Sequence, residues 1–264
     1  MRKLGNPPIE ERGDRDFVAS LEKGLEVLTC FDRAHSKLTV SEVARLTGAS
    51  PASARRSLLT LHALGYVAHD GKQFWLCPKV LLVANAFLAS RPIPSIAQPL
   101  LDALSERTRE SASLAQLMGN EVMIIARSTA RRSLSVGLNI GSRLPVYSSA
   151  TGRVLLAALP PSEAQARVRA MDLRRLTLRT ETTPEAVLAL VEAARQDGHA
   201  ISDGELELEV RSMAVPVFNH AGDTVAALSI AIRADRMSRS ELRQSFLPVL
   251  RRAQAQLRRQ LFEG

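Results

Sequence analysis

The stretch from residue 39 to residue 65, TVSEVARLTGASPASARRSLLTLHALG, decides the fold of the N-terminal part of the chain. Thr39 and Glu42 form a capping-box pattern, and Gly48 supplies a turn after one short helix. Ser50, followed by a proline, suits the start of a second helix, which a glycine ends. Two short helices around a tight turn predict a helix-turn-helix motif.

The apolar residues predict which face of each helix is buried. The inward stripe of the first helix is Val40, Val43, Ala44 and Leu46, and that of the second is Ala54, Leu58, Leu61 and Gly65. The opposite face of the second helix carries small residues and arginines, which suit close approach to base edges and phosphates. An isolated arginine pair is more often a solvated surface, but the surrounding motif favours DNA.

A hairpin follows the second helix. Residues 66–68 and 73–76 read as two strands joined by an Asp-Gly turn, so the unit is predicted to be a winged helix-turn-helix. Lys72 at the tip is expected to reach DNA beside the second helix, although charged tips also serve simply to solvate turns. The predicted DNA-binding residues are Thr39, Ser50, Ala52, Ser53, Arg55, Arg56, Thr60, Lys72 and Gln73.

The positive charge is concentrated where DNA is expected. The window 33–79 holds seven basic and two acidic residues, whereas 91–232 holds fifteen of each. The middle of the chain is therefore not built for nucleic acid, which predicts a second function there. The tail from residue 233 is again basic, with eight basic and three acidic residues. These charges are spread around an amphipathic helix, which favours a solvated helix face over a nucleic-acid contact.

The 264 residues allow two domains: a winged domain at 14–77, a linker helix and hinge at 78–94, and a second domain at 95–264. The second domain is expected to be an antiparallel α+β module of the kind that encloses a small ligand. Its expected helices are 95–109, 149–158, 161–170, 184–197 and 238 to the end, and its expected strands are a hairpin turning at 119–120, then 133–138, 210–217 and 224–232.

Two further helices bear on assembly. Leu21, Leu25, Leu28 and Phe31 have helical spacing and predict the first helix of the winged domain. The helix at 79–89 is more apolar than one buried face requires, so it either packs against its own copy in a homodimer or packs on the next domain. A single small winged domain also offers too few contacts for a specific site, which favours paired half-sites.

The sequence resembles the isocitrate lyase regulator (IclR) family of bacterial transcription factors. The resemblance rests on SLEKGLEVL at 20–28, the helix-turn-helix segment at 39–67, GSRLPVYSSATGRVLLAALP at 141–160, and 198–232. Two of these segments look most like the branch that regulates the β-ketoadipate pathway. The resemblance implies an N-terminal winged helix-turn-helix domain, a linker helix and a C-terminal GAF-like α+β domain. It also implies operator DNA as partner and a homodimer or a dimer of dimers.

The resemblance further implies a small carboxylic acid effector such as protocatechuate, 4-hydroxybenzoate or β-ketoadipate. Its expected contacts are Val136, Tyr147, Ala150, Thr151, Asp203, Val210, Ser212, Ser229 and Ala231. Asp203 is placed in a loop that closes the site, and the effector carboxylate is expected at the helix start near Ala150, with Arg153 or Tyr147 as an added donor. Departures from the family at Ser148 and Ser212 leave other acids open, including short-chain oxo and dicarboxylic acids.

Other functions are less well supported. Ser20 and Lys23 match the S-x-x-K pattern of acyl enzymes without its companion motifs, and the five histidines have no metal-type spacing, so no enzyme, metal or cofactor is expected. A ligand-independent DNA-binding protein would not need the large neutral region. No apolar run reaches the roughly 18 residues of a membrane span and the start lacks a signal peptide, which predicts a cytoplasmic protein. RNA polymerase is a further candidate partner.

Overall fold

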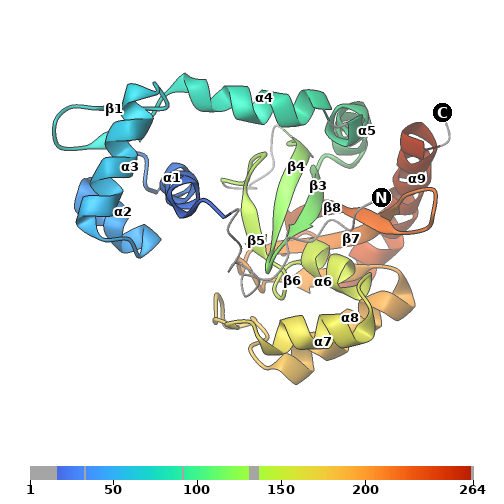
Figure 1. Ribbon diagram of the computed structural model, residues 1–264. Helices are drawn as coiled ribbons and strands as arrows, with labels where there is room; N and C mark the ends of the chain where they lie inside the picture. The colour runs from blue at the N-terminus through green and yellow to red at the C-terminus, as the bar shows by residue number, and fades with distance from the viewer. Residues whose placement is uncertain (1–16, 33, 91, 131–136, 263–264) are drawn as a thin grey trace. The chain divides into compact units, whose positions relative to one another are not determined.

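The computed structural model describes residues 17–32, 34–90, 92–130 and 137–262. They fall into two compact units, divided between Ser90 and Arg91, inside the hinge predicted at 78–94 (Figure 1). Among the described residues no single helix is long and apolar enough to cross a membrane, although the broken pair 78–90 and 93–108 together meets the criteria of length and composition.

The first unit is a helix-turn-helix followed by a short hairpin. Its elements are α1 (Ala19–Thr29), α2 (Val40–Thr47), α3 (Pro51–Ala63), β1 (Val67–His69), β2 (Phe74–Leu76), the 3-10 turn η2 (Pro78–Val80) and α4 (Leu81–Ser90). The capping box at Thr39 is formed, and Gly48 ends α2 with φ 67°, a left-handed conformation that glycine adopts without strain. Strands β1 and β2 pair antiparallel, which confirms the predicted wing.

The core of this unit confirms most of the predicted buried face. Ala54, Leu58 and Leu61 of α3 are buried against Val43 of α2 and Val27 of α1. Leu46 and Gly65 were expected on the inward faces and are exposed instead, and Leu21 and Leu25 of α1 are exposed as well. In α1 the face that meets α3 is the one carrying Val27, so the face of Leu21 and Leu25 is left uncovered.

The second unit is built on a six-stranded antiparallel sheet. Its elements are α5 (Pro92–Thr108), β3 (Ser111–Met118), β4 (Glu121–Ser128), β5 (Arg143–Pro145), α6 (Ala150–Ala157), α7 (Pro161–Arg169), α8 (Pro184–Asp197), β6 (Ala200–Asp203), β7 (Val210–Phe218), β8 (Thr224–Arg233) and α9 (Arg239–Phe262). The strand order is β5-β4-β3-β8-β7-β6. This arrangement confirms the predicted antiparallel α+β class.

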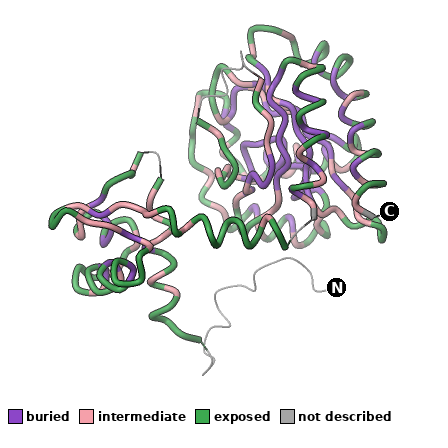
Figure 2. The backbone as a smooth tube through the Cα atoms, turned by 90° about the horizontal axis from the view of Figure 1, so that it is seen from above, coloured by how far each residue is buried: buried purple, intermediate pink, exposed green. Residues whose placement is uncertain are grey.

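Helices cover both faces of the sheet (Figures 1 and 2). On one face, Met213, Val215, Leu228 and Ile230 pack against leucines of α5 and α9. On the other, Ala115, Ala200, Ala214 and Ala227 pack against α6 and α8. The alternation of side chains along each strand assigns every strand residue to one of these two layers. At these sheet positions the second layer carries alanine, where the first carries larger aliphatic side chains.

One helix boundary and three strands differ from the sequence prediction. Helix α5 begins at Pro92 and not at residue 95, because prolines are tolerated in the first turn of a helix. Strands β5 and β6 were not predicted, since three or four residues are too few for a periodicity signal. Of the strand expected at 133–138, residues 133–136 lie outside the described residues, and residues 137 and 138 are not in a strand.

Candidate nucleic-acid interface and effector site

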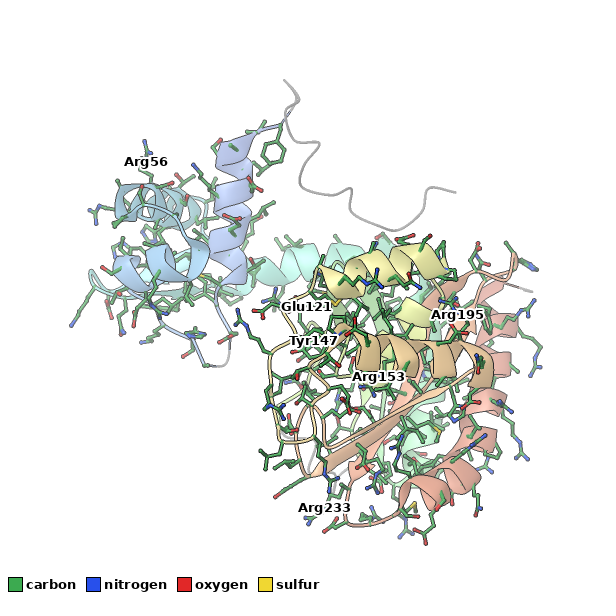
Figure 3. The ribbon with its side chains drawn as sticks, turned by 90° about the horizontal axis from the view of Figure 1, so that it is seen from below. Arg56, Glu121, Tyr147, Arg153, Arg195 and Arg233 are labelled. Atoms are coloured by element: carbon green, nitrogen blue, oxygen red, sulfur yellow. The ribbon has the colours of Figure 1, made fainter. Side chains whose placement is uncertain are left out.

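The outer face of α3 is open to solvent. Ala52, Arg55, Arg56 and Thr60 are exposed and Ser53 is half-buried. Arg56 projects away from the body of its unit (Figure 3). Because Ala54 and Leu58 anchor the opposite face, the arginines are held outward on a rigid helix. This surface is shaped to enter a groove of DNA.

The hydroxyls of Thr39 and Ser50 are engaged as helix caps. Thr39 Oγ1 donates to Glu42 Oε2 at 2.8 Å, and Ser50 Oγ accepts from the Ser53 N–H at 3.3 Å. The hydrogen bonds from the Thr39 backbone and hydroxyl lower the pKa of the Glu42 carboxyl. The two residues therefore fix the first turns of α2 and α3. This role as helix caps does not depend on any contact with DNA.

The hairpin tip is held by one aspartate. Asp70 Oδ1 accepts the backbone N–H groups of Gln73 at 2.8 Å and Lys72 at 3.0 Å, and these bonds lower the pKa of its carboxyl. Lys72 is exposed and Gln73 is half-buried. Lys37 Nζ lies 4.6 Å from the ring centroid of Trp75. This contact places a further cation beside the wing, at a position that the sequence motif does not indicate.

In the second unit, the start of α6 sits tightly on the segment before it. A Cβ added at Gly152 would lie 2.2 Å from the carbonyl oxygen of Val146, so only glycine fits there. Ser149 Oγ accepts the Gly152 N–H at 3.1 Å and caps the helix. Ala150 and Thr151, both buried, therefore occupy a fixed position under the sheet.

Arg153 was expected as an effector donor, but the structure assigns it a structural role. Its side chain is 1% exposed and forms a two-pronged ion pair with the Glu205 carboxylate, with 2.7 Å between Nη1 and Oε1. It also donates to the carbonyls of Tyr147 at 3.2 Å and Ile201 at 3.1 Å. These bonds tie α6 to the segment after β6, which explains the buried charge (Figure 3).

Tyr147 is likewise occupied. Its hydroxyl donates to the Arg174 carbonyl at 2.9 Å, and burial raises the pKa of this phenol. The ring packs in the core layer beneath α6. Tyr147 therefore anchors the segment around residue 174.

Two rows of small side chains cross the sheet on the α6 face, and we call them the small-residue rows. Strand pairing aligns Ala200, Ala214, Ser229, Ser113 and Arg127 in one row, and Ser202, Ser212, Ala231 and Ser111 in the next. Every side chain in these rows is alanine or serine, except Arg127 at one end of the first row. The expected effector positions Ser212, Ser229 and Ala231 belong to these rows, and Val210 lies on the same face.

The prediction for Asp203 is wrong. It is the last residue of strand β6 and not part of a loop, and its side chain alternates away from the α6 face. It accepts from Arg211 Nε at 2.8 Å, and Arg211 also donates to the Ala234 carbonyl at 2.9 Å. Ser202, one residue earlier, lies on the α6 face and donates to the Ser148 carbonyl at 2.7 Å. Val136 lies outside the described residues.

Two buried hydroxyls near the start of α6 lack a partner. Within the described part of the chain, Ser148 Oγ and Thr151 Oγ1 make no hydrogen bond, and both residues are at least nine-tenths buried. A buried polar group without a partner is costly, so these hydroxyls need a water, a ligand or a further side chain to complete their bonding. No cluster of three potential metal ligands is found among the described residues.

Sequence comparisons cover both units. Residues 20–71 match the family described as the IclR helix-turn-helix domain, and residues 85–259 match the bacterial transcriptional regulator IclR C-terminal family. The chain is 41% identical over 251 residues to the Pca regulon regulatory protein of Pseudomonas putida, covering 95% of this chain and 86% of the relative. It is 36% identical to the p-hydroxybenzoate hydroxylase transcriptional activator of Acinetobacter baylyi, covering 94% of each.

Solved structures agree with this assignment. A protein from Rhodococcus sp. RHA1 superposes with a TM-score of 0.78 at 42% identity, over 93% of this chain and 98% of that one. An IclR homolog from Microbacterium hydrocarbonoxydans, complexed with 4-hydroxybenzoate, superposes with a TM-score of 0.75 at 25% identity, over 92% and 98% of the two chains. With both domains matched in sequence and in fold, the chain belongs to the IclR family of bacterial transcriptional regulators.

Proposed function

We propose that the protein is a ligand-responsive regulator of an aromatic-compound catabolic operon, which binds operator DNA through its first unit and a small aromatic carboxylic acid through its second. It acts by binding and not by catalysis. The observation that carries the proposal is the pairing of an exposed basic recognition helix with a separate site of small buried residues, in a chain whose relatives are named for Pca and p-hydroxybenzoate regulation.

In this account α3 lies in the major groove and the wing touches the backbone beside it. Arg56 reads a base because it lies opposite the buried arc of α3, whereas Arg55 at the flank supports the contact. Lys72 at the wing tip contacts phosphate and contributes no sequence preference. The caps at Thr39 and Ser50 set the angle of the helices and present backbone groups to the DNA.

Replacing Arg56 by alanine is expected to weaken specific operator binding by about 1–3 kcal/mol, because a base-reading arginine makes paired hydrogen bonds to guanine. Fluorescence anisotropy with operator DNA measures the loss, and Lys72→Ala serves as the control that weakens specific and nonspecific DNA alike. Operator affinity of Arg56→Ala equal to that of the natural protein would contradict the assignment.

The second site suits an aromatic acid. The small side chains of the rows suit contact with a flat ring, and their serines offer hydroxyls to its oxygens. Thr151 and Ser148 add two buried hydroxyls at the start of α6. Short-chain oxo and dicarboxylic acids are alternative ligands that would use the same hydroxyls but leave the space over the rows unfilled.

A thermal-shift screen with protocatechuate, 4-hydroxybenzoate, pyruvate and adipate tests this assignment. A ligand present at 100 times its dissociation constant should stabilise the protein by about 2.7 kcal/mol. The expected result is a clear shift with an aromatic acid and none with its decarboxylated phenol. A shift with pyruvate or adipate alone selects the alternative ligand class, and no shift with any acid contradicts a carboxylic acid effector.

The exposed apolar surface of the first unit supports homodimer formation. Leu81, Leu82, Val83 and Phe87 of α4 are 40–64% exposed, and none of the α4 side chains is buried (Figure 2). Leu21 and Leu25 of α1 are exposed as well. A second copy would cover such a surface, and paired subunits match paired half-sites in an operator. Two such dimers make the dimer of dimers.

Substituting Leu82 and Phe87 together by serine is expected to convert the dimer to a monomer and to shorten the operator footprint to one half-site. Sedimentation velocity and DNase footprinting measure both. A monomer in the natural protein would contradict the proposal, and so would an unchanged dimer in the double variant, which would place the interface elsewhere.

A further inference from the structure

One arginine, Arg127, lies at the end of the first of the two small-residue rows. Arg127 of β4 pairs with Ser113 of β3, which pairs with Ser229 of β8, so all three side chains lie on the face covered by α6. Its Nη1 donates to Ser113 Oγ at 2.7 Å, and its Nε donates to Thr129 Oγ1 at 3.2 Å. A guanidinium is thereby held over a strip that otherwise carries only alanine and serine.

Partial burial makes this guanidinium more responsive to an anion. Arg127 is half-buried, and the loss of solvation lowers the pKa of its side chain, although it stays charged at any physiological pH. Removal from water strengthens the attraction between a fixed cation and a carboxylate, because water no longer screens it as well. A planar guanidinium also matches a carboxylate with two parallel hydrogen bonds.

We infer that Arg127 binds the effector carboxylate and so makes the site selective for acids; the inference rests on the proposed function. Strands β4 and β8 are second neighbours, so about 9–10 Å separates the Cα atoms of Arg127 and Ser229. An arginine side chain directed along the row covers Ser113 and meets a ligand that lies over Ser229. The ring then spans the rows, and its hydroxyl reaches Ser148 and Thr151.

This orientation reverses the one expected from the sequence, in which the carboxylate met the start of α6. A helix start carries roughly half a positive charge, and Ser149 already occupies one of its N–H groups. Arg127 carries a full charge. The buried hydroxyls of Thr151 and Ser148 are neutral and suit a phenolic hydroxyl, which both donates and accepts hydrogen bonds.

The test compares acid and neutral ligands on the full chain. Isothermal calorimetry is run with 4-hydroxybenzoate and with 4-hydroxybenzamide, on the natural protein, on Arg127→Gln and on Arg127→Lys. Arg143→Gln is the matched control, because Arg143 is an exposed arginine on neighbouring strand β5, paired with Glu121 at 3.3 Å. Circular dichroism with urea denaturation reports that each variant is folded, because operator binding depends on the other unit.

The expected result is a loss of about 10- to 100-fold in affinity for the acid in Arg127→Gln, the scale of a charge-assisted hydrogen bond, with amide binding nearly unchanged. Arg127→Lys should keep the preference for acid at reduced affinity, and Arg143→Gln should match the natural protein.

Two results would overturn the inference: unchanged acid affinity in Arg127→Gln, or equal losses for acid and amide, which would show that Arg127 only holds the fold. If Arg127→Gln does not fold, Arg127→Lys decides by its acid-to-amide ratio, and a ratio of one overturns the inference. If the natural protein binds no acid, the proposed function itself fails.

Discussion

Replacing Arg153 by methionine is expected to lower the free energy of unfolding by about 3–5 kcal/mol, the cost of leaving the partner of a buried ion pair uncompensated. The Arg153 side chain is 1% exposed and that of Glu205 is 10% exposed. Methionine keeps an unbranched apolar stem but lacks the guanidinium, so it leaves the Glu205 carboxylate and the carbonyls of Tyr147 and Ile201 without their donor. Urea denaturation followed by circular dichroism measures the change.

Arg233→Met is the matched control. Arg233 pairs with Asp235 at 2.6 Å, but both side chains are exposed, so solvent and salt screen the pair (Figure 3). Its denaturation midpoint should equal that of the natural protein. An Arg153→Met midpoint that is also unchanged would show that the Glu205 pair does not hold α6 in place.

Replacing Thr151 by leucine is expected to abolish the effector response while operator binding is retained. Thr151 is buried at the start of α6, where we propose that the effector binds, so the larger side chain is expected to exclude the ring. The DNA-reading residues lie in the other unit and keep their geometry. Calorimetry with 4-hydroxybenzoate and anisotropy with operator DNA measure the two activities separately.

Thr151→Val separates the effect of a larger side chain from the effect of losing the hydroxyl. Valine has the shape of threonine without the hydroxyl, and Thr151 Oγ1 has no protein partner within the described residues, so the fold should tolerate it. Ligand binding should survive, weakened by about one hydrogen bond, or roughly 0.5–1.5 kcal/mol. A normal response in Thr151→Leu would place the pocket elsewhere.

Much of the first unit could be predicted because its signals are local. The cap at Thr39, the turn at Gly48 and the burial of Leu58 and its neighbours on α3 each depend on a few nearby residues, and each is confirmed. The exposed positions of Leu21 and Leu25 could not be predicted this way. Helical spacing shows that a face is apolar, but not which partner covers it.

The effector site depended on contacts that are distant in sequence. Ser113 and Arg127 belong to the small-residue rows only because β3 pairs with both β4 and β8. This strand order cannot be predicted from local sequence patterns. Asp203 was placed in a loop, whereas it ends strand β6 with its side chain on the face opposite α6. Recognising the short strand β6 would have placed Ser202 at the site.

The central claim is that one chain couples DNA reading in its first unit to an aromatic acid in its second, and a single titration tests it most directly. DNA selected from a random pool by the natural protein is labelled, and its affinity for the protein is measured by anisotropy at increasing 4-hydroxybenzoate or protocatechuate. The account predicts a saturable change in DNA affinity for the natural protein and none for Thr151→Leu. DNA affinity that is the same at every concentration of both acids would contradict it.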